Sequence, residues 1–122
     1  MSDVLDIGGR DGVATIVSDF IDRCHADFII GFLFEGTDAE RTKRHETEMA
    51  LRVLGDPVHY TGRPIGRTHK PKRINQGHYR RRLAILRTVL SDHDVPDAIR
   101  DTWLAHQESF RAVVTNERDC LD

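Results

Sequence analysis

Apolar residues recur in this chain at the spacing of α-helices, and this pattern limits the fold more than any other feature. In the first stretch they follow the i, i+3, i+4, i+7 spacing of a helix with one buried face. They are Val13, Ile16, Val17, Phe20, Ile21 and Cys24, preceded by Gly8 and Gly9 as a flexible joint. No segment alternates between apolar and polar residues as a half-buried β-strand would. The sequence therefore predicts a protein built from helices.

A second helix is predicted from about residue 38 to residue 54 by signals at both ends. Thr37 is followed three residues later by Glu40, which is the spacing of a capping box at a helix start. At the other end, Gly55 can adopt the left-handed conformation that ends helices, and Pro57 cannot continue one. The chain should therefore leave the helix near Gly55.

Two further helices are predicted after a long connection. Residues 55 to about 74 are rich in Gly, Pro and Arg and carry no helical stripe. The third stripe consists of Tyr79, Leu83, Leu86 and Leu90. A first-turn proline, Pro96, would open a fourth helix with apolar positions Ile99, Trp103, Phe110 and Val114. The expected fold is one small all-α domain over residues 1–122, in which the long loop needs a function to explain it.

Charge and composition argue against several classes of partner. The formal net charge is −2 and the pI about 6.4, so no global positive charge favours nucleic acid or an anionic membrane. Cys24 and Cys120 form no CxxC pair, which favours reduced thiols. The N-terminal sequence MSDVLDIGG lacks the features of a signal peptide, and no apolar run is long enough to cross a bilayer. We therefore expect a cytoplasmic protein that binds neither nucleic acid nor membranes.

Several histidines lie in or beside the long connection, near its arginines. His59, His69 and His78 belong to this region, and His45 lies on the helix before it. On that helix Thr42, His45, Glu46 and Met49 fall at i, i+3, i+4 and i+7, so one face presents polar groups beside the apolar residues Met49, Ala50 and Val53. From spacing alone, His45 is a partly exposed seam residue and His69 a loop histidine. Their separation matches no local zinc signature.

A set of short motifs in a fixed order favours a sharper interpretation. They are IGG at 7–9, DF at 19–20, GFLFEGT at 31–37, LGDP at 54–57, YTGRPIGRTH at 60–69 and INQGHY at 74–79. With these motifs the chain resembles, from Ile7 to about Leu90, a truncated haemoglobin of the first group. The resemblance implies a two-over-two helical sandwich around haem. It covers about two thirds of the chain, and the last helix is supported only by length and periodicity.

The resemblance also implies roles for individual residues of a haem pocket. His69 corresponds to the proximal iron ligand, whose other ring N–H needs an acceptor such as a loop carbonyl. Phe34 corresponds to an aromatic residue that stacks against haem, and His78 to a position near haem that does not bind the iron. The other implied cofactor-binding residues are Leu33, Thr42, Lys43, Met49, Tyr60, Ile65, Arg73, Ile74, Tyr79 and Leu86.

Haem b, held without a covalent bond, is the expected cofactor. The sequence has no CxxCH motif, and His106 does not fall where a haem-linking histidine is found in some relatives. Candidate partners for the two haem propionates are the basic residues Lys43, Arg63, Arg67, Lys70, Lys72 and Arg73.

The distal side departs from the common pattern of these proteins. Ile21 stands where they usually carry a tyrosine that donates to bound dioxygen, and Thr42 and Glu46 stand where glutamine or leucine is frequent. These three residues form the predicted ligand pocket. Losing the tyrosine removes a hydrogen bond worth on the order of 1 kcal/mol, so tight oxygen storage is less favoured. His45 matches a histidine that binds iron as a sixth ligand in some members.

The resemblance therefore implies binding of O2, NO or CO at a His69-ligated iron, with His45 as the favoured, displaceable sixth ligand. Such a site suits redox or nitrogen-oxide chemistry, with an electron donor or reductase as partner. The alternative is a five-coordinate globin for oxygen binding or transport, with His45 swung outward. Nitric-oxide oxidation and weak peroxidase activity are both open. A more remote alternative is a haem-free helical module that binds nucleic acid or another partner through the basic segment 63–82.

Overall fold

The computed structural model describes residues 3–62 and 74–115. Its helices are α1 (Asp3–Asp6), α2 (Gly9–Ala26), the 3-10 helix η1 (Gly31–Phe34), α3 (Ala39–Val53), α5 (Gln76–Asp92), α6 (Asp97–Glu108) and α7 (Arg111–Val114). Within these residues, the β-type pairing consists of an isolated parallel bridge between Ile74 and Thr115. The all-α class predicted from the helical stripes is confirmed.

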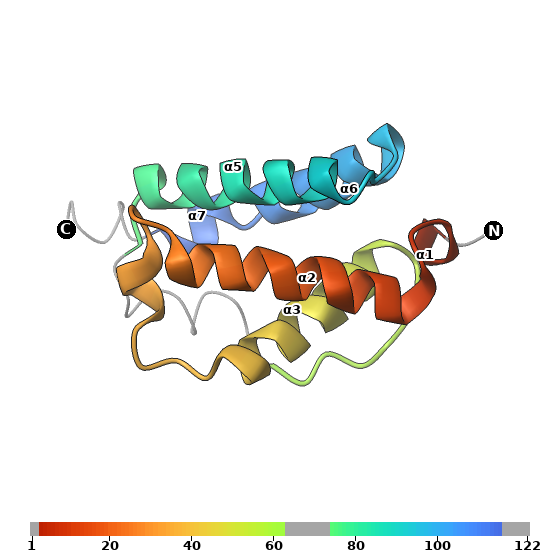
Figure 1. The fold of residues 1–122 in the computed structure, drawn as a ribbon, viewed down its shortest axis with the longest axis horizontal. Helices are drawn as coiled ribbons and strands as arrows, with labels where there is room; N and C mark the ends of the chain where they lie inside the picture. Colours follow the sequence, from red (N-terminus) through yellow and green to blue (C-terminus); the bar gives the residue numbers. More distant parts are fainter. Residues whose placement is uncertain (1–2, 63–73, 116–122) are drawn as a thin grey trace.

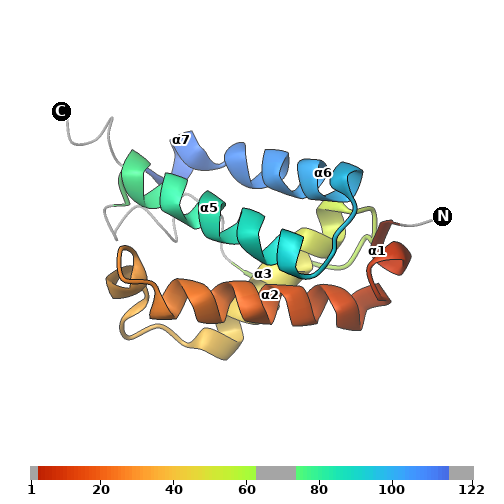
Figure 2. The ribbon, with the colours of Figure 1, turned by 45° about the horizontal axis from the view of Figure 1, so that its top comes forward.

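The long helices form two layers. α2 and α3 lie in one layer, and α5 and α6 lie in the other (Figure 1 and Figure 2). The helices within each layer are in contact, and α2 also contacts α5 across the layers. The short helix α7 lies near the N-terminal end of α5. This is the predicted two-over-two arrangement.

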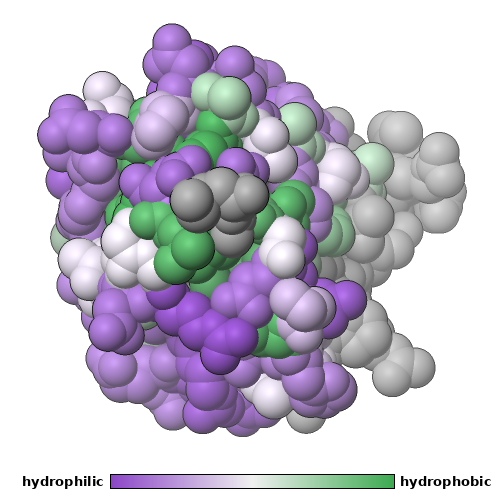
Figure 3. Space-filling model, turned by 90° about the vertical axis from the view of Figure 1, so that its right-hand side faces the viewer, coloured by the Kyte–Doolittle hydropathy of each residue, from purple (hydrophilic) through white to green (hydrophobic). Residues whose placement is uncertain are grey.

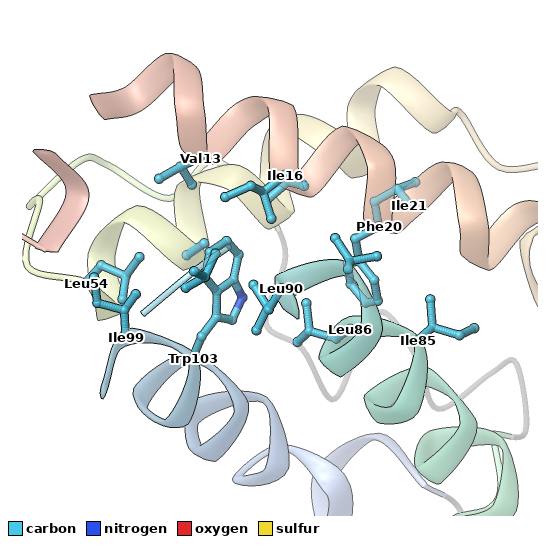
Figure 4. Packing of buried hydrophobic residues seen from close by; sticks show 14 of the residues in the cluster. Val13, Ile16, Phe20, Ile21, Leu54, Ile85, Leu86, Leu90, Ile99 and Trp103 are labelled. Carbon is cyan, nitrogen blue, oxygen red and sulfur yellow. The ribbon is translucent and has the colours of Figure 1, made fainter. Parts of the chain in front are cut away.

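The main hydrophobic core lies between the two layers. All the apolar residues of the first predicted stripe are buried on α2. In Figure 4, Trp103 of α6 lies beside Leu90 of α5, and side chains of α2 come down on them from the opposite layer. Phe20 and Trp103 are each only 2% exposed, and burying a large apolar side chain contributes roughly 2 to 3 kcal/mol. The helical stripes therefore hold the layers together.

The start of α3 differs from the prediction by one residue. Asp38 is the N-cap, and its Oδ1 accepts hydrogen bonds from the backbone N–H groups of Glu40 at 3.1 Å and Arg41 at 3.2 Å. The predicted cap, Thr37, instead donates its hydroxyl to the carbonyl of Phe34 at 2.6 Å. The predicted capping box was wrong because the Thr37 hydroxyl bonds to the end of η1. The predicted end of the helix is confirmed, since Gly55 has a φ of 100°.

The predicted fourth helix is divided in two. α6 ends at Glu108, and the Ser109 hydroxyl donates to the carbonyl of His106 at 2.6 Å before α7 begins. The prediction of one helix through Val114 was therefore wrong. The break lets Phe110 and Val114 join a second apolar cluster with Ile74 and Tyr79. This cluster forms one wall of the cavity described below.

The end of the molecule that carries α1 is mostly hydrophilic, with some apolar side chains near its centre (Figure 3). In the described part of the chain, no helix has both the length and the apolar character to span a membrane. Cys24 is buried and its thiol is free, while Cys120 lies outside the described residues.

Candidate functional site

A cavity of about 380 Å³ opens between α3 and the N-terminal half of α5, and residues of η1, α6 and α7 complete its walls. The lining residues are Ile30, Leu33, Phe34, Thr37, Asp38, Arg41, Thr42, His45, Glu46, Met49, Tyr60, Ile74, His78, Tyr79, Arg82, Gln107, Phe110 and Val114. Half of these residues are apolar or aromatic, and the other half are polar or charged. Cavities of this kind bind a large, mostly apolar ligand and orient it through those polar groups.

One wall of the cavity is the predicted polar face of α3. Thr42, His45, Glu46 and Met49 all line it, because residues three and four apart share one side of a helix. The prediction from sequence spacing that these four side chains share one face is therefore confirmed. The opposite wall comes from α5, through His78, Tyr79 and Arg82, and neither wall could form the cavity without the other.

His45 carries a nitrogen that no described residue satisfies. Its ring lies 5.8 Å from the ring of Tyr60, in an edge-on arrangement. The Nε2 atom is buried and has no hydrogen-bond partner within residues 3–62 and 74–115. Buried polar atoms are nearly always paired, and an unpaired one is costly by roughly 1 to 3 kcal/mol. An imidazole nitrogen in this situation is suited to bind a group that enters the cavity.

A buried ion pair in the lining of the cavity joins α5 to α3. Arg82 of α5 donates from Nη2 to Oε1 of Glu46 on α3, and each side chain is only 14% exposed. Gln107 Oε1 also accepts from Arg82, at 3.0 Å from Nη2 and 3.3 Å from Nε. Burial disfavours the charged form of Arg82, but the attraction of Glu46 and of other neighbouring groups outweighs it and raises the pKa of Arg82 above its ordinary value. The guanidinium is therefore charged at every relevant pH.

The sequence did contain a signal for Arg82. It lies three residues after Tyr79 and four before Leu86, so it shares their buried face of α5. The run of three arginines at 80–82 instead suggested a solvated basic surface. Gln107, Phe110 and Arg41 were also missed as lining residues, and for Phe110 the reason is that the break after α6 was not predicted. Gln107 lies on α6 four residues after Trp103, so the helical spacing could have placed it on the buried face.

Tyr79 and His78 are held by hydrogen bonds next to the cavity. The Tyr79 hydroxyl donates to the carbonyl of Gln107, and burial raises its pKa to about 12, so it stays protonated. His78 belongs to a capping box at the start of α5. Its ring Nδ1 accepts from the backbone N–H of Asn75 at 3.2 Å, and its backbone N–H donates to Asn75 Oδ1 at 2.8 Å. The capping role uses one ring nitrogen of His78 and fixes the ring beside the cavity.

Other predicted site residues lie away from the cavity lining. Ile21 and Leu86 are fully buried in the main core, where the layers pack. The Nζ atom of Lys43 lies 2.8 Å from a carboxylate oxygen of Asp22 on α2. It also lies 3.6 Å from a carboxylate oxygen of Glu40, which is on α3 with Lys43. The predicted residues outside the described part of the chain are Arg63, Ile65, Arg67, His69, Lys70, Lys72 and Arg73.

Comparison with known proteins identifies the family. A family profile described as bacterial-like globin matches residues 5–116. The chain belongs to this globin family. A group 1 truncated haemoglobin from Mycolicibacterium paratuberculosis is 33% identical over 73 residues, which are 60% of this globin and 54% of that relative. This globin thus matches about half the length of that relative. A group 1 truncated haemoglobin from Tetrahymena pyriformis is 26% identical over 93 residues, covering 76% and 77% of the two chains.

Solved structures show the same fold. The truncated haemoglobin of Tetrahymena pyriformis in its Fe(III) form has a TM-score of 0.84 at 23% identity, covering 94% of this globin and 98% of that chain. The 2/2 haemoglobin of a Synechococcus species has a TM-score of 0.83 at 22% identity, covering 96% and 100%. The two-over-two sandwich is therefore shared well beyond the region of the sequence motifs.

Haem is the cofactor that this family implies, usually in its non-covalent form, and globins bind small diatomic ligands such as O2 at it. The cavity fits such a group. Its aromatic and apolar walls suit a porphyrin, and the unpaired His45 Nε2 suits its iron. Within the described ranges, no three His, Cys, Asp or Glu side chains gather to bind a metal ion directly. Haem iron needs only one or two protein ligands, so this arrangement agrees with haem.

Proposed function

We propose that this globin binds haem through His69 and uses His45 as a displaceable sixth ligand, so that O2, NO or CO binds only after His45 leaves. The observation that carries the proposal is the buried, unpartnered Nε2 of His45 on the cavity wall. The role of His69 rests on the family motif at 60–69, because that residue lies outside the described part of the chain.

The cavity residues would hold the cofactor in complementary ways. Haem supplies the iron at which diatomic ligands bind and one-electron redox change occurs. Phe34 is the candidate to stack against the porphyrin because it lines the cavity, and its ring lies 4.8 Å from the ring of His25 on α2. Leu33, Met49 and Ile74 supply apolar contact, and Arg41 at the cavity edge is a candidate to pair with a propionate.

The proposed sixth ligand determines which chemistry suits the protein. When His45 occupies the site, an incoming ligand binds with an affinity reduced by the fraction of molecules whose site is open. Ile21 provides no hydroxyl to stabilise bound dioxygen. Both features favour redox or nitrogen-oxide chemistry, with an electron donor or reductase as partner, over tight oxygen storage. We place this activity in the cytoplasm, where the reducing conditions also suit a free Cys24.

The absorption spectrum of the haem-loaded protein tests the proposal. We expect ferric and ferrous wild type to be low-spin and six-coordinate without added ligand, and His45→Ala to become high-spin. His78→Gln is a matched control, because it changes another cavity histidine but leaves a side chain able to cap α5. Its spectrum should stay low-spin. Replacement of His69 by glycine should release haem unless imidazole is added.

The alternative, a five-coordinate oxygen-binding globin, makes a different prediction. Wild type and His45→Ala would then both be high-spin and alike, and the proposed sixth ligand would be wrong. A protein that takes up no haem would contradict both versions and favour an interaction module. Salt-sensitive binding of nucleic acid by colourless protein would point to the basic segment 63–82.

A further inference from the structure

Arg82 brings a positive charge to the wall of the cavity, which an apolar cofactor pocket does not require. Burying an ion pair is often no more stabilising than apolar packing of the same volume, so stability alone does not account for it. The pair does not lie at the molecular surface, where charges are common. It lies where a small ligand of the iron would bind if His45 is the sixth ligand, because Glu46, Arg82 and His45 all line the same cavity.

The guanidinium is held firmly but keeps free donors. Its Nε and Nη2 atoms bond to Gln107 and Glu46, and its Cζ atom lies 4.8 Å from the centre of the Phe20 ring. Within the described residues, the bonds to Glu46 and Gln107 run from Nε and Nη2, the Tyr79 hydroxyl is a further hydrogen-bonding neighbour of the guanidinium, and Nη1 is not among the buried unpaired atoms. A guanidinium has five N–H donors, so at least one donor on Nη1 stays available to an acceptor in the cavity.

We propose that Arg82 makes this cavity selective for small monovalent anions, such as nitrite, over neutral ligands of the same size. The Nη1 donors and the charge of Arg82 bind the anion, and Glu46 limits the strength of binding by neutralising part of that charge. The inference rests on the proposed function, because the anion is expected to bind beside haem.

The contacts of Arg82 allow the charge of Arg82 and the charge of Glu46 to be removed separately by substitution. Gln107 and Phe20 hold the guanidinium from the sides not occupied by Glu46. Glu46→Gln therefore removes a negative charge, keeps a side chain of similar size and leaves Arg82 in place. Arg82→Met removes the positive charge and leaves Glu46 as the excess charge of the cavity. The two variants break the same ion pair, but they change the charge of the cavity in opposite directions.

The test is a set of dissociation constants measured by absorption titration of the ferric, haem-loaded protein. The probes are sodium nitrite and sodium azide as anions and nitric oxide as a neutral ligand. The ratio of anion affinity to nitric-oxide affinity reports on charge, because release of His45 affects both kinds of ligand equally. We expect Arg82→Met to lower this ratio by about tenfold or more and Glu46→Gln to raise it severalfold. Arg80→Met removes an exposed charge from the same helix and should leave the ratio unchanged.

The directions of the two changes decide the outcome. If Arg82 and Glu46 only stabilise the fold, both variants will shift the ratio in the same direction or leave it unchanged, and the inference is overturned. Arg82→Lys keeps the charge and should retain most of the anion preference. If Arg82→Met loses haem, the severalfold rise expected for Glu46→Gln tests the inference by itself, and a ratio that does not rise overturns it. The spin state of His45→Ala, measured separately, reports on the sixth ligand. A failure of the proposed function is therefore distinguishable from a failure of anion selectivity.

Discussion

His45 and Arg82 reach the same cavity from different helices, but their hydrogen bonding is opposite. His45 has a buried Nε2 without a partner in the described ranges, whereas Arg82 bonds to Glu46 and Gln107 and still has donors to spare. A residue of the first kind binds an incoming group at one atom. A residue of the second kind supplies charge to its surroundings. Under the two proposals, His45 would bind the iron and Arg82 would select the ligand, and both side chains line the same cavity.

Cys24 gives a prediction at the scale of one residue. Its side chain is completely buried on α2, and burial raises the pKa of its thiol to about 12. Because the thiolate is the reactive form, the thiol should react very slowly with Ellman's reagent at about pH 8. The experiment uses Cys120→Ser, so that Cys24 is the remaining thiol.

Unfolding provides the control for this experiment. In denaturant the same thiol should react fully within minutes, since both burial and the raised pKa are lost. Rapid reaction of the folded Cys120→Ser protein would mean that α2 opens often or packs differently from the structure.

At the scale of the element, α3 depends on a cap that sequence spacing misplaced. Both Thr37 and Asp38 are residues that cap helices, and only Thr37 has a glutamate three residues later. The structure uses Thr37 to close the turn after η1, which leaves the backbone N–H groups of α3 to Asp38. Of the two possible capping residues, the turn after η1 therefore selects Asp38, because it already uses the Thr37 hydroxyl.

Asp38→Ala should therefore destabilise the protein by about 1 kcal/mol, because the first turn of α3 loses its acceptor. The free energy of unfolding in urea, compared at one haem concentration, measures the loss. Asp38→Asn keeps a capping oxygen and should lose much less. An equal loss in the alanine and asparagine variants would show that the charge of Asp38, rather than its cap, is what matters.

At the scale of the whole molecule, Asp27 joins the two layers beyond the main core. It follows α2, accepts from the backbone N–H groups of Ile29 and Ile30, and pairs with Arg81 of α5 at 2.6 Å. The Arg81 guanidinium, together with the two N–H groups, holds the pKa of Asp27 below its ordinary value of 3.8. The carboxylate thus ties the turn before η1, and hence one side of the cavity, to α5.

The sign of this shift predicts how stability depends on pH. Because the folded pKa is lower than the unfolded one, the contribution of Asp27 is fully present above 3.8 and is lost as the pH falls through the folded pKa. Asp27→Asn keeps an acceptor for the two N–H groups but removes the charge. We expect wild type to be more stable than the variant at about pH 7, with the difference shrinking as the pH falls below 3.8.

Thermal unfolding of both proteins across this pH range measures the effect. Asp11→Asn, an exposed change on α2, controls for the general loss of a carboxylate. A difference between wild type and Asp27→Asn that stays constant down to low pH would contradict the assignment, since the pair with Arg81 would then contribute nothing through its charge.

Much of this protein could be predicted from sequence, because the signals involved are local. The stripes on α2 and α5, the end of α3 at Gly55 and the common face of Thr42, His45, Glu46 and Met49 all follow from helical periodicity and turn chemistry. The break after α6 was not predictable in this way. Its apolar positions kept a helical spacing through Val114, while packing against Ile74 and Tyr79 favoured a separate turn.

The sequence by itself determined the helices, the family motifs and the set of side chains on each helical face, because each depends on residues within one or two turns of one another. Only the tertiary structure decided that the Arg82 side chain, unlike an exposed arginine such as Arg80, is directed into the cavity and pairs there with Glu46. A buried charge is tolerated only when a partner is buried with it. That partner lies on another helix, far away in the chain, so the pairing exists only once the two layers have come together.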